Sequence, residues 1–257
     1  MLFSLTPIDF IIILPFIFLA GFLDAIAGGG GLISLPAYWS AGIPAHMALG
    51  TNKFSSSFGT VFSTGRYFRA GMIDVPVAVI GAAMALLGSW LGASTAMITS
   101  ANFLNYLLII LIPAITVLTL LRRKFGFTDS ANLLKLGYRL TLGALAGLVI
   151  GFYDGFFGPG TGTFLILIYS GLLHYDFVRA NGNSKVVNMA SNVAAMVTFA
   201  VHGQILYALA IPAAVCGIAG NMVGSKMVVL RGNKLIHKVL VLAMILLLAR
   251  VIYNAIL

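Results

Sequence analysis

The stretch GFLDAIAGGGG occupies residues 21–31, and a close copy, GFYDGFFGPGT, occupies residues 151–161, 130 positions further along. A second pair follows in the same order, with ALGTNK at residues 48–53 and ANGNSK at residues 180–185. Matched landmarks at nearly constant spacing are typical of an internal repeat. The chain is therefore interpreted as a duplicated unit of about 120 residues.

The sequence around these landmarks is far too apolar for a soluble protein. Hydrophobic residues make up 60% of the 257 residues and charged residues only 8%, whereas charged residues make up about 25% of an average soluble domain. The apolar residues occur in long continuous runs rather than in the alternating pattern of a membrane β-barrel. The composition predicts an all-α polytopic membrane protein.

Each repeat unit contains five apolar segments, of which four are long enough to cross the roughly 30 Å of a bilayer core. The second segment of each unit is too short, and glycine or proline interrupts the chain just before it. We expect eight full-length spans and two short helices, each broken from the preceding span or turned back on it; the sequence leaves open whether the short helices span or re-enter. The expected segments are 8–27, 31–41, 45–68, 74–98 and 102–121, then 138–157, 161–173, 179–201, 205–229 and 235–256.

Basic residues indicate the orientation of the repeats. If each broken pair leaves and returns to one side, every unit crosses the membrane an odd number of times and the two repeats are inverted. Most basic residues then share one face, with Lys53 and Arg250 elsewhere, whereas parallel repeats would move Lys226 to Lys238 to the outer face. The positive-inside rule therefore favours inverted repeats with both termini outside. The residues expected on the inner face are Arg66, Arg69, Arg122, Arg123, Lys124, Lys135, Arg139, Arg179, Lys185, Lys226, Arg231, Lys234 and Lys238.

This topology divides the chain into three parts. Residues 1–125 form the first membrane repeat, residues 126–137 a basic cytoplasmic linker, and residues 138–257 the second membrane repeat. The net charge of +9 comes largely from short loops of this kind, so we expect a lipid bilayer and no nucleic acid as partner.

The two glycine clusters are the first candidate binding elements. Interrupted helices in matching positions are typical of secondary transporters and mark the substrate site. A helix that restarts after glycines presents free backbone N–H groups and a partial positive charge, which suits an oxyanion. The alternative is that the glycines only form tight turns or close helix contacts. The candidate residues are Gly28, Gly29, Gly30 and Gly31 in one half, and Gly158, Gly160 and Thr161 in the other.

A lysine flanked by polar side chains opens the third segment of each half, as Thr51-Asn52-Lys53 and as Asn183-Ser184-Lys185. An ionised side chain at membrane depth costs at least about 2.5–3.5 kcal/mol, so two at matched positions indicate a task. Lysine supplies a compact positive charge, while Asn, Ser and Thr supply orienting donors for an anion. The alternative is that both ammonium groups extend to the membrane interface and only set the topology.

Asp24 and Asp154 lie four residues before the glycine clusters, again in matched positions. Each carboxyl group could carry a coupling proton. Each could instead have a structural role, capping backbone N–H groups or neutralising the lysine of its own half. An ionised carboxylate would repel an anionic substrate, so it would have to be protonated or paired with a lysine.

Further polar residues follow each lysine at helical spacing and could line a polar path or hydrogen-bond between helices. They are Ser55, Ser56, Ser57 and Thr60 in the first half, and Asn188, Ser191 and Asn192 in the second. The G-x-x-x-G pairs Gly88/Gly92 and Gly220/Gly224 predict close helix packing. We expect no metal, no cofactor and no enzymatic activity, because the sequence has one cysteine and lacks the H-E-x-x-H, Walker and nucleophile-elbow motifs.

At these residues the sequence resembles the TauE/SafE family of sulfite exporters, also called TSUP, and within it the YfcA-type branch. The resemblance rests on GFLDAIAGGGGLISLP with ALGTNK, and on GFYDGFFGPGTG with NSK, and it extends over nearly the whole chain. One difference between the halves is Ile166 where the first half has Pro36. The matching positions are Asp24, Gly28 to Gly31, Pro36, Asn52, Lys53, Asp154, Gly158, Gly160, Asn183 and Lys185.

The resemblance implies an inner-membrane permease for a small sulfur-containing anion such as sulfite, thiosulfate, sulfoacetate or another organosulfonate. We expect the anion to bind between the glycine breaks of the two repeats, which would rock to expose it alternately. An anion channel and a non-transporting membrane assembly factor are the alternatives. The sequence leaves open the sulfur species, the direction of transport, the coupling ion (a proton or Na⁺) and a homodimeric assembly.

Overall fold

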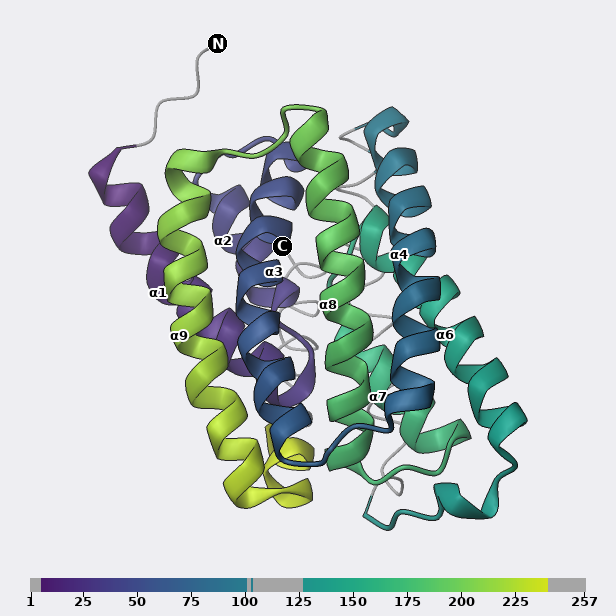
Figure 1. Ribbon diagram of the computed structural model, residues 1–257. Coiled ribbons are helices and arrows are strands. Elements are labelled where there is room, and N and C mark those ends of the chain that lie inside the picture. The colour runs from purple at the N-terminus through teal and green to yellow at the C-terminus, as the bar shows by residue number, and fades with distance from the viewer. Residues whose placement is uncertain (1–5, 101–102, 104–126, 240–257) are drawn as a thin grey trace, which may run out of the picture.

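The computed structural model describes residues 6–100, 103 and 127–239 of the chain. These residues form a bundle of helices joined by short turns, with no strand in the described ranges (Figure 1). The helices are α1 (Pro7–Ala27), α2 (Gly31–Ser40), α3 (Ala45–Arg69), α4 (Val75–Ile98), the 3-10 turn η1 (Ala131–Leu133), α6 (Leu136–Phe156), α7 (Thr161–Leu172), α8 (Phe177–Val201) and α9 (Tyr207–Arg231).

Eight of the ten expected segments correspond to these helices, with ends that differ by at most two residues. The expected segment 102–121, except Phe103, and most of segment 235–256 lie outside the described residues. Five helices, α1, α4, α6, α8 and α9, are long and apolar enough to cross a membrane, which is the pattern of a polytopic protein. Helix α3 has 25 residues, but it carries a run of buried polar side chains between Thr51 and Thr64.

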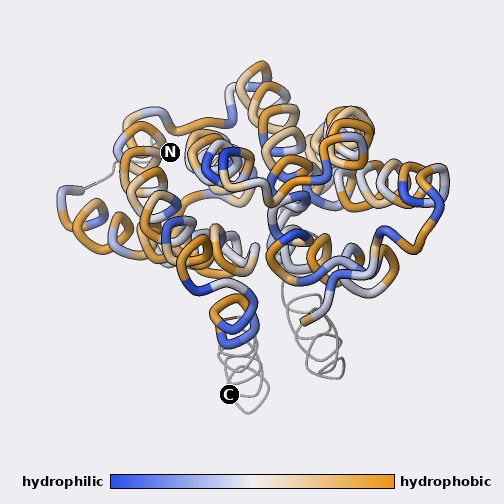
Figure 2. The backbone as a smooth tube through the Cα atoms, turned by 60° about the horizontal axis from the view of Figure 1, so that its bottom comes forward, coloured by the Kyte–Doolittle hydropathy of each residue, from blue (hydrophilic) through white to orange (hydrophobic). Residues whose placement is uncertain are grey.

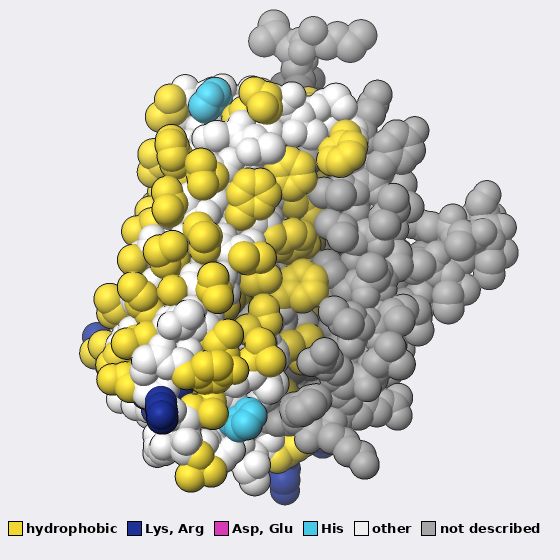
Figure 3. Space-filling model, turned by 90° about the vertical axis from the view of Figure 1, so that its right-hand side faces the viewer, with side chains coloured by type: hydrophobic (Ala, Val, Ile, Leu, Met, Phe, Trp, Pro, Cys, Tyr) yellow, Lys and Arg dark blue, Asp and Glu magenta, His cyan; other side chains and the backbone are white. Residues whose placement is uncertain are grey.

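The sides of the bundle are covered by apolar side chains that a soluble protein would bury. Val79 on α4, Val149 on α6 and Val215 on α9 are each about three-fifths exposed. Figure 3 shows one such side, on which hydrophobic side chains extend over most of the height and Lys and Arg gather near one end. Figure 2 shows the same apolar character along the described helices. These sides are suited to contact lipid.

Both short helices fold back on the helix before them. Helix α1 ends at Ala27, and Gly28 follows with φ of 76°, a left-handed conformation that glycine adopts without strain. Leu35 on α2 then packs in the same buried cluster as Ile13 and Ile17 on α1, so α2 returns along α1.

The second half turns in the same way. The Tyr153 hydroxyl on α6 donates to the carbonyl oxygen of Pro159 over 2.6 Å, and its ring lies edge-on to Phe164 on α7, with centroids 5.5 Å apart. The sequence left open whether each short helix is broken from the preceding span or turned back on it. Both short helices are turned back.

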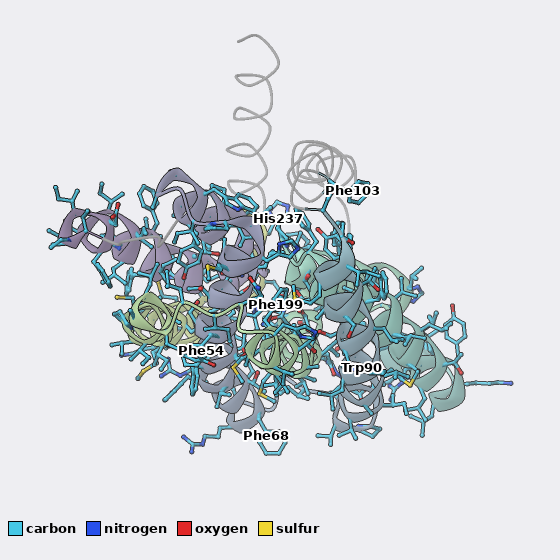
Figure 4. The ribbon with its side chains drawn as sticks, turned by 90° about the horizontal axis from the view of Figure 1, so that it is seen from above. Phe54, Phe68, Trp90, Phe103, Phe199 and His237 are labelled. Atoms are coloured by element: carbon cyan, nitrogen blue, oxygen red, sulfur yellow. The ribbon has the colours of Figure 1, made fainter. Side chains whose placement is uncertain are left out.

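Helices α3 and α8 cross the centre of the bundle in opposite directions. Gly50 near the start of α3 lies against Phe199 near the end of α8, and the Thr64 hydroxyl near the end of α3 donates to the Lys185 carbonyl near the start of α8, over 3.2 Å. Seen from above, Phe199 lies near the centre of the bundle while Phe68 projects from the rim (Figure 4). The matched third helices of the two units therefore lie antiparallel at the centre.

The G-x-x-x-G pairs join helices of different halves. A Cβ atom at Gly92 on α4 would collide with the Phe152 carbonyl oxygen on α6, and one at Gly224 on α9 would collide with that of Phe22 on α1. Close packing at these glycines is therefore confirmed. Phe22 and Phe152 occupy matched positions, so α1 packs on α9 as α6 packs on α4.

One end of the bundle carries most of the described basic residues. Arg66 and Arg69 end α3, Lys135 and Arg139 open α6, and Arg231 ends α9. Lys185 was expected on this face, and that expectation is wrong. It lies inside α8 with none of its surface exposed, because an aspartate of the other half binds it there.

Candidate functional site

The two glycine turns touch each other at the centre of the bundle. A Cβ atom at Gly28 would overlap the backbone of Gly162, and one at Gly31 would lie 3.2 Å from the Cα atom of Pro159. The Thr163 hydroxyl at the start of α7 donates to the Ala27 carbonyl at the end of α1, over 2.8 Å. The glycines therefore allow two main chains to meet where any side chain would separate them.

Lys53 of the first half forms a buried ion pair with Asp154 of the second half. The Lys53 Nζ atom lies 2.7 Å from Asp154 Oδ1, and each side chain is only 2% exposed. Asp154 also accepts hydrogen bonds from the hydroxyls of Thr161, over 2.7 Å, and Ser191, over 2.5 Å. The lysine donates a second bond to Asn192 Oδ1 over 3.1 Å. This carboxylate is satisfied on both oxygens, as a buried charge requires.

Lys185 of the second half pairs in the reciprocal way with Asp24 of the first half. The Lys185 Nζ atom lies 2.8 Å from Asp24 Oδ2, with the lysine fully buried and the aspartate 14% exposed. One prediction for the aspartates was that each neutralises the lysine of its own half. That prediction is wrong: each aspartate pairs with the lysine of the other half, because α3 and α8 lie between the two broken helix pairs, α1–α2 and α6–α7. Neither ammonium group reaches the surface, so extension to the interface is not the arrangement observed.

Two of the other predicted side chains lie beside these pairs. Asn52 Oδ1 accepts a hydrogen bond from Ser34 of α2 over 2.5 Å. The Ser184 hydroxyl donates to the Gly162 carbonyl over 3.2 Å, which ties α8 to the second glycine turn. Ser184 thus contacts the second glycine turn itself, and Asn52 contacts α2 just after the first.

Thr51 and Asn183 point elsewhere. The Thr51 hydroxyl accepts the backbone N–H of Leu206 over 3.1 Å, and Asn183 Oδ1 accepts that of Asp74 over 3.2 Å. Each therefore joins its helix to the loop beside α9 or α4. The structure does not bring these two side chains to the ion pairs.

The polar residues that follow each lysine have different contacts in the two repeats. In α3, Ser57 and Thr60 donate to carbonyl oxygens of their own helix. In α8, Ser191 and Asn192 contact the Lys53–Asp154 pair directly, and Asn188 Oδ1 accepts from Asn192 over 2.6 Å. The second-half residues therefore contact the Lys53–Asp154 pair, whereas Ser55 and Ser56 of the first half line a cavity beside Asp24.

Three contributors were missed from the sequence. Asn181 Nδ2 donates to the Ala25 carbonyl over 3.0 Å, and the Tyr67 hydroxyl donates to the same carbonyl over 2.7 Å. Both satisfy the backbone at the end of α1, just before the glycine turn. Ser34, which bonds Asn52, is the third. The position of Asn181 within ANGNSK was the one available signal.

A small polar cavity of about 20 Å³ lies between α1, α2, α3 and α9. Asp24 lines it, together with Ser34, Asn52, Ser55 and Asn221. The cavity offers space for roughly one water molecule. The glycine-turn site therefore has a small hollow beside Asp24.

A second ionic cluster fastens the halves at the basic end. Asp74 Oδ2, at the start of α4, lies 3.1 Å from an Arg139 nitrogen and 3.2 Å from an Arg179 nitrogen, and it accepts the Tyr175 hydroxyl over 2.7 Å. Burial and then this bond to Asp74 raise the pKa of Tyr175 above its ordinary value. The hydroxyl thus stays protonated and can donate. This cluster is structural and lies away from the glycine turns.

No group of three or more His, Cys or Asp side chains in the described ranges is arranged to hold a metal ion. The groups gathered at the turns are two ammonium groups, two carboxylates, several hydroxyls and amides, and glycine backbone. Such a set can exchange ion pairs and hydrogen bonds with a small charged guest.

Comparison with known proteins identifies the family of the chain. The chain matches the family described as Sulfite exporter TauE/SafE over residues 13–251. It is 32% identical over 254 residues to the probable membrane transporter protein YfcA of Escherichia coli strain K12, which covers 99% of this chain and 93% of that relative. Similar relatives are the probable membrane transporter protein ORF9 of Sinorhizobium sp., 36% identical over 236 residues (91% of this chain, 89% of the relative), and a probable membrane transporter protein of Haemophilus influenzae, 36% identical over 237 residues (92% of each). No solved structure matches the chain significantly. The chain belongs to the TauE/SafE family, whose named relatives here are membrane transporters.

Proposed function

We propose that this protein is a secondary transporter of the inner membrane that carries a small sulfur-containing anion, such as sulfite, thiosulfate or an organosulfonate, and that it catalyses no reaction. The description of the family as sulfite exporters supports the substrate class. The contact between Gly28 and Gly162 carries the argument, because it brings backbone from both interrupted helix pairs to one point.

The anion binds at this point by exchange with the resident ion pairs. Each lysine already faces a carboxylate, so an incoming oxyanion replaces Asp24 or Asp154 as partner of an ammonium group rather than meeting a free charge. Asn52, Ser184 and the N–H groups of the glycine turns supply the remaining donors. Because each lysine belongs to one half and its aspartate to the other, opening a pair also loosens the contact between the halves.

The two halves act as inverted membrane repeats, residues 1–125 and 138–257, joined by a basic cytoplasmic linker at residues 126–137. The antiparallel packing of α3 and α8 and the gathering of basic residues at one end support this topology. With each broken pair, α1–α2 and α6–α7, leaving and returning to one side, both termini lie on the periplasmic side. Rocking of the halves about α3 and α8 then alternates access to the site.

The test is binding followed by flux with the purified, reconstituted chain. Thermal unfolding is recorded with sulfite, sulfate, thiosulfate and methanesulfonate, since a ligand at a hundredfold excess over its Kd stabilises by about 2.7 kcal/mol. Lys53→Ala and Lys185→Ala should abolish the stabilisation, whereas Lys226→Ala, an exposed lysine on α9, should keep it. Vesicles should then accumulate the binding anion. If no sulfur anion binds or moves, the proposed function is wrong.

A further inference from the structure

The two buried aspartates differ in their surroundings although they occupy matched positions. Asp24 lines the polar cavity and is 14% exposed, whereas Asp154 is 2% exposed and accepts hydrogen bonds on both oxygens. Water in the cavity can therefore reach Asp24, while Thr161, Ser191 and Lys53 enclose Asp154. Of these two carboxyl groups, Asp24 is the one that can exchange a proton with solvent.

Differences in sequence between the two repeats explain why Asp24 lies beside a cavity and Asp154 does not. Three small side chains that line the cavity correspond to larger apolar ones in the second repeat. The pairs are Ala20 with Ile150, Ser34 with Phe164, and Ser55 with Val187. The cavity is therefore specific to the Asp24 side of the bundle and is not a chance gap between two equal copies.

The cavity wall also contains an unsatisfied acceptor. Asn221 on α9 is 2% exposed and lines the cavity; its Nδ2 atom donates to the Gly217 carbonyl over 3.0 Å, but its Oδ1 atom has no hydrogen-bond partner. A buried amide oxygen normally has a donor. A water molecule in the cavity is small enough to supply it and to connect it to the Asp24 carboxyl.

Charge balance determines what must accompany an anion into the site. Lys53 and Lys185 balance Asp24 and Asp154, so the site is neutral before substrate enters. A monoanion alone would leave one uncompensated negative charge among apolar helices, which costs several kcal/mol. A proton on one carboxyl group restores neutrality and releases one ammonium group.

We propose that Asp24 is the proton-binding site of this transporter and that one proton enters with each monoanion. This rests on the proposed function and adds the coupling ion to it. The proton passes from cavity water to Asp24 Oδ2, the bond to Lys185 breaks, and the Lys185 ammonium binds the anion. The Lys53–Asp154 ion pair stays closed throughout.

The charged and titratable groups around Asp24 are consistent with this exchange. Lys185 faces it from α8, and Lys53 and Tyr67 lie near it on α3. Helices α2 and α9 contribute uncharged side chains to the cavity, Ser34 and Asn221. Protonation of Asp24 thus leaves Lys185 as the ammonium group that lacks a partner.

The probe is methanesulfonate, a monoanion at every pH between about 5 and 8, so any pH dependence of its binding belongs to the protein. Because one proton is taken up with each anion, we expect binding to the wild-type chain to weaken by up to about tenfold per pH unit as the pH rises. Calorimetry in buffers of different ionisation enthalpy should show one proton taken up per anion. Asp24→Asn, which mimics the protonated acid, should bind without pH dependence. Asp129→Asn, which removes a partly exposed carboxylate that pairs with Arg179 at the basic end and lies outside the site, should keep it.

The outcomes separate the two proposals. If methanesulfonate binds with the same affinity at every pH, or with no proton uptake by the wild-type chain, then Asp24 is not the coupling site although the transporter proposal stands. Retained pH dependence in a folded Asp24→Asn variant likewise means that Asp24 is not the coupling site. If Asp24→Asn fails to fold, the proton count of the wild-type chain decides. Absence of binding by methanesulfonate and by every other sulfur anion at all pH values overturns both proposals.

Discussion

The Lys53–Asp154 pair allows a quantitative test of the site by a double-mutant cycle. Lys53→Met removes the ammonium group and keeps most of the side-chain volume, and Asp154→Asn removes the opposing charge. At 2.7 Å and an effective dielectric constant of about 20, the attraction between the two charges is about 6 kcal/mol. Desolvation of both groups offsets much of it, but a single substitution leaves the other charge buried and unpaired.

We therefore expect each single variant to lower the free energy of unfolding by about 3–5 kcal/mol. The double variant should lie within about 2 kcal/mol of the wild-type chain, because it buries no unpaired charge. The coupling energy then amounts to several kcal/mol, far above the usual range for exposed pairs. The measurement is reversible unfolding in mixed micelles, followed by circular dichroism.

Lys226→Met is the control, since this lysine is exposed and should change stability by at most about 0.5 kcal/mol. Additive effects of Lys53→Met and Asp154→Asn would refute the reasoning, because additivity means that the two groups do not interact. So would a loss below about 1 kcal/mol for either single variant, which would mean that the remaining charge is solvated.

Three further predictions concern packing and the basic end. Gly28→Ala should prevent folding or lower the free energy of unfolding by more than about 3 kcal/mol, because its Cβ would overlap Gly162 at a position with positive φ. The control is Gly65→Ala, whose Cβ would point into open space and which should be neutral or stabilising by up to about 1 kcal/mol. Thermal unfolding distinguishes the two variants. Gly92→Val should separate α4 from α6 and yield aggregated protein in gel filtration. Asp74→Asn should lower the free energy of unfolding by about 3 kcal/mol, measured in the same micelles, and an unchanged value would mean that the arginines around it are solvated.

Much of the fold could be predicted from the repeat and from hydrophobic length alone. The third segment, expected at 45–68, is the helix Ala45–Arg69, and the glycine clusters mark the points where α1 and α6 end. These features are local, since they depend on runs of apolar residues and on glycines that permit a left-handed turn. Which helices pack together could not be predicted in this way, because the G-x-x-x-G pairs predict a close contact but not its partner.

At the site, the sequence indicated the ionisable residues but not their pairing. Lys53 and Asp24 are close in the chain, yet each binds a group about 100 or more residues away in the other half. Thr51 and Asn183 could have been excluded, because a residue two positions before a lysine lies about 200° around a helix from it. Asn181 could have been included, because it lies four residues before Lys185 and therefore on the same face of the helix. Asn221 carried no such signal, since isolated amides in apolar helices are common and only their neighbours define their role.

The crosswise ion pairs have a consequence for synthesis. The ribosome completes the first repeat before Asp154 exists, so Lys53 enters the bilayer without the carboxylate that later binds it, and Asp24 likewise enters before Lys185 is made. Within the nascent first half, these two residues are the available counter-charges for each other. Maturation then requires them to exchange partners when the second half inserts, so two halves produced as separate polypeptides should each be unstable alone and should become stable only when co-expressed.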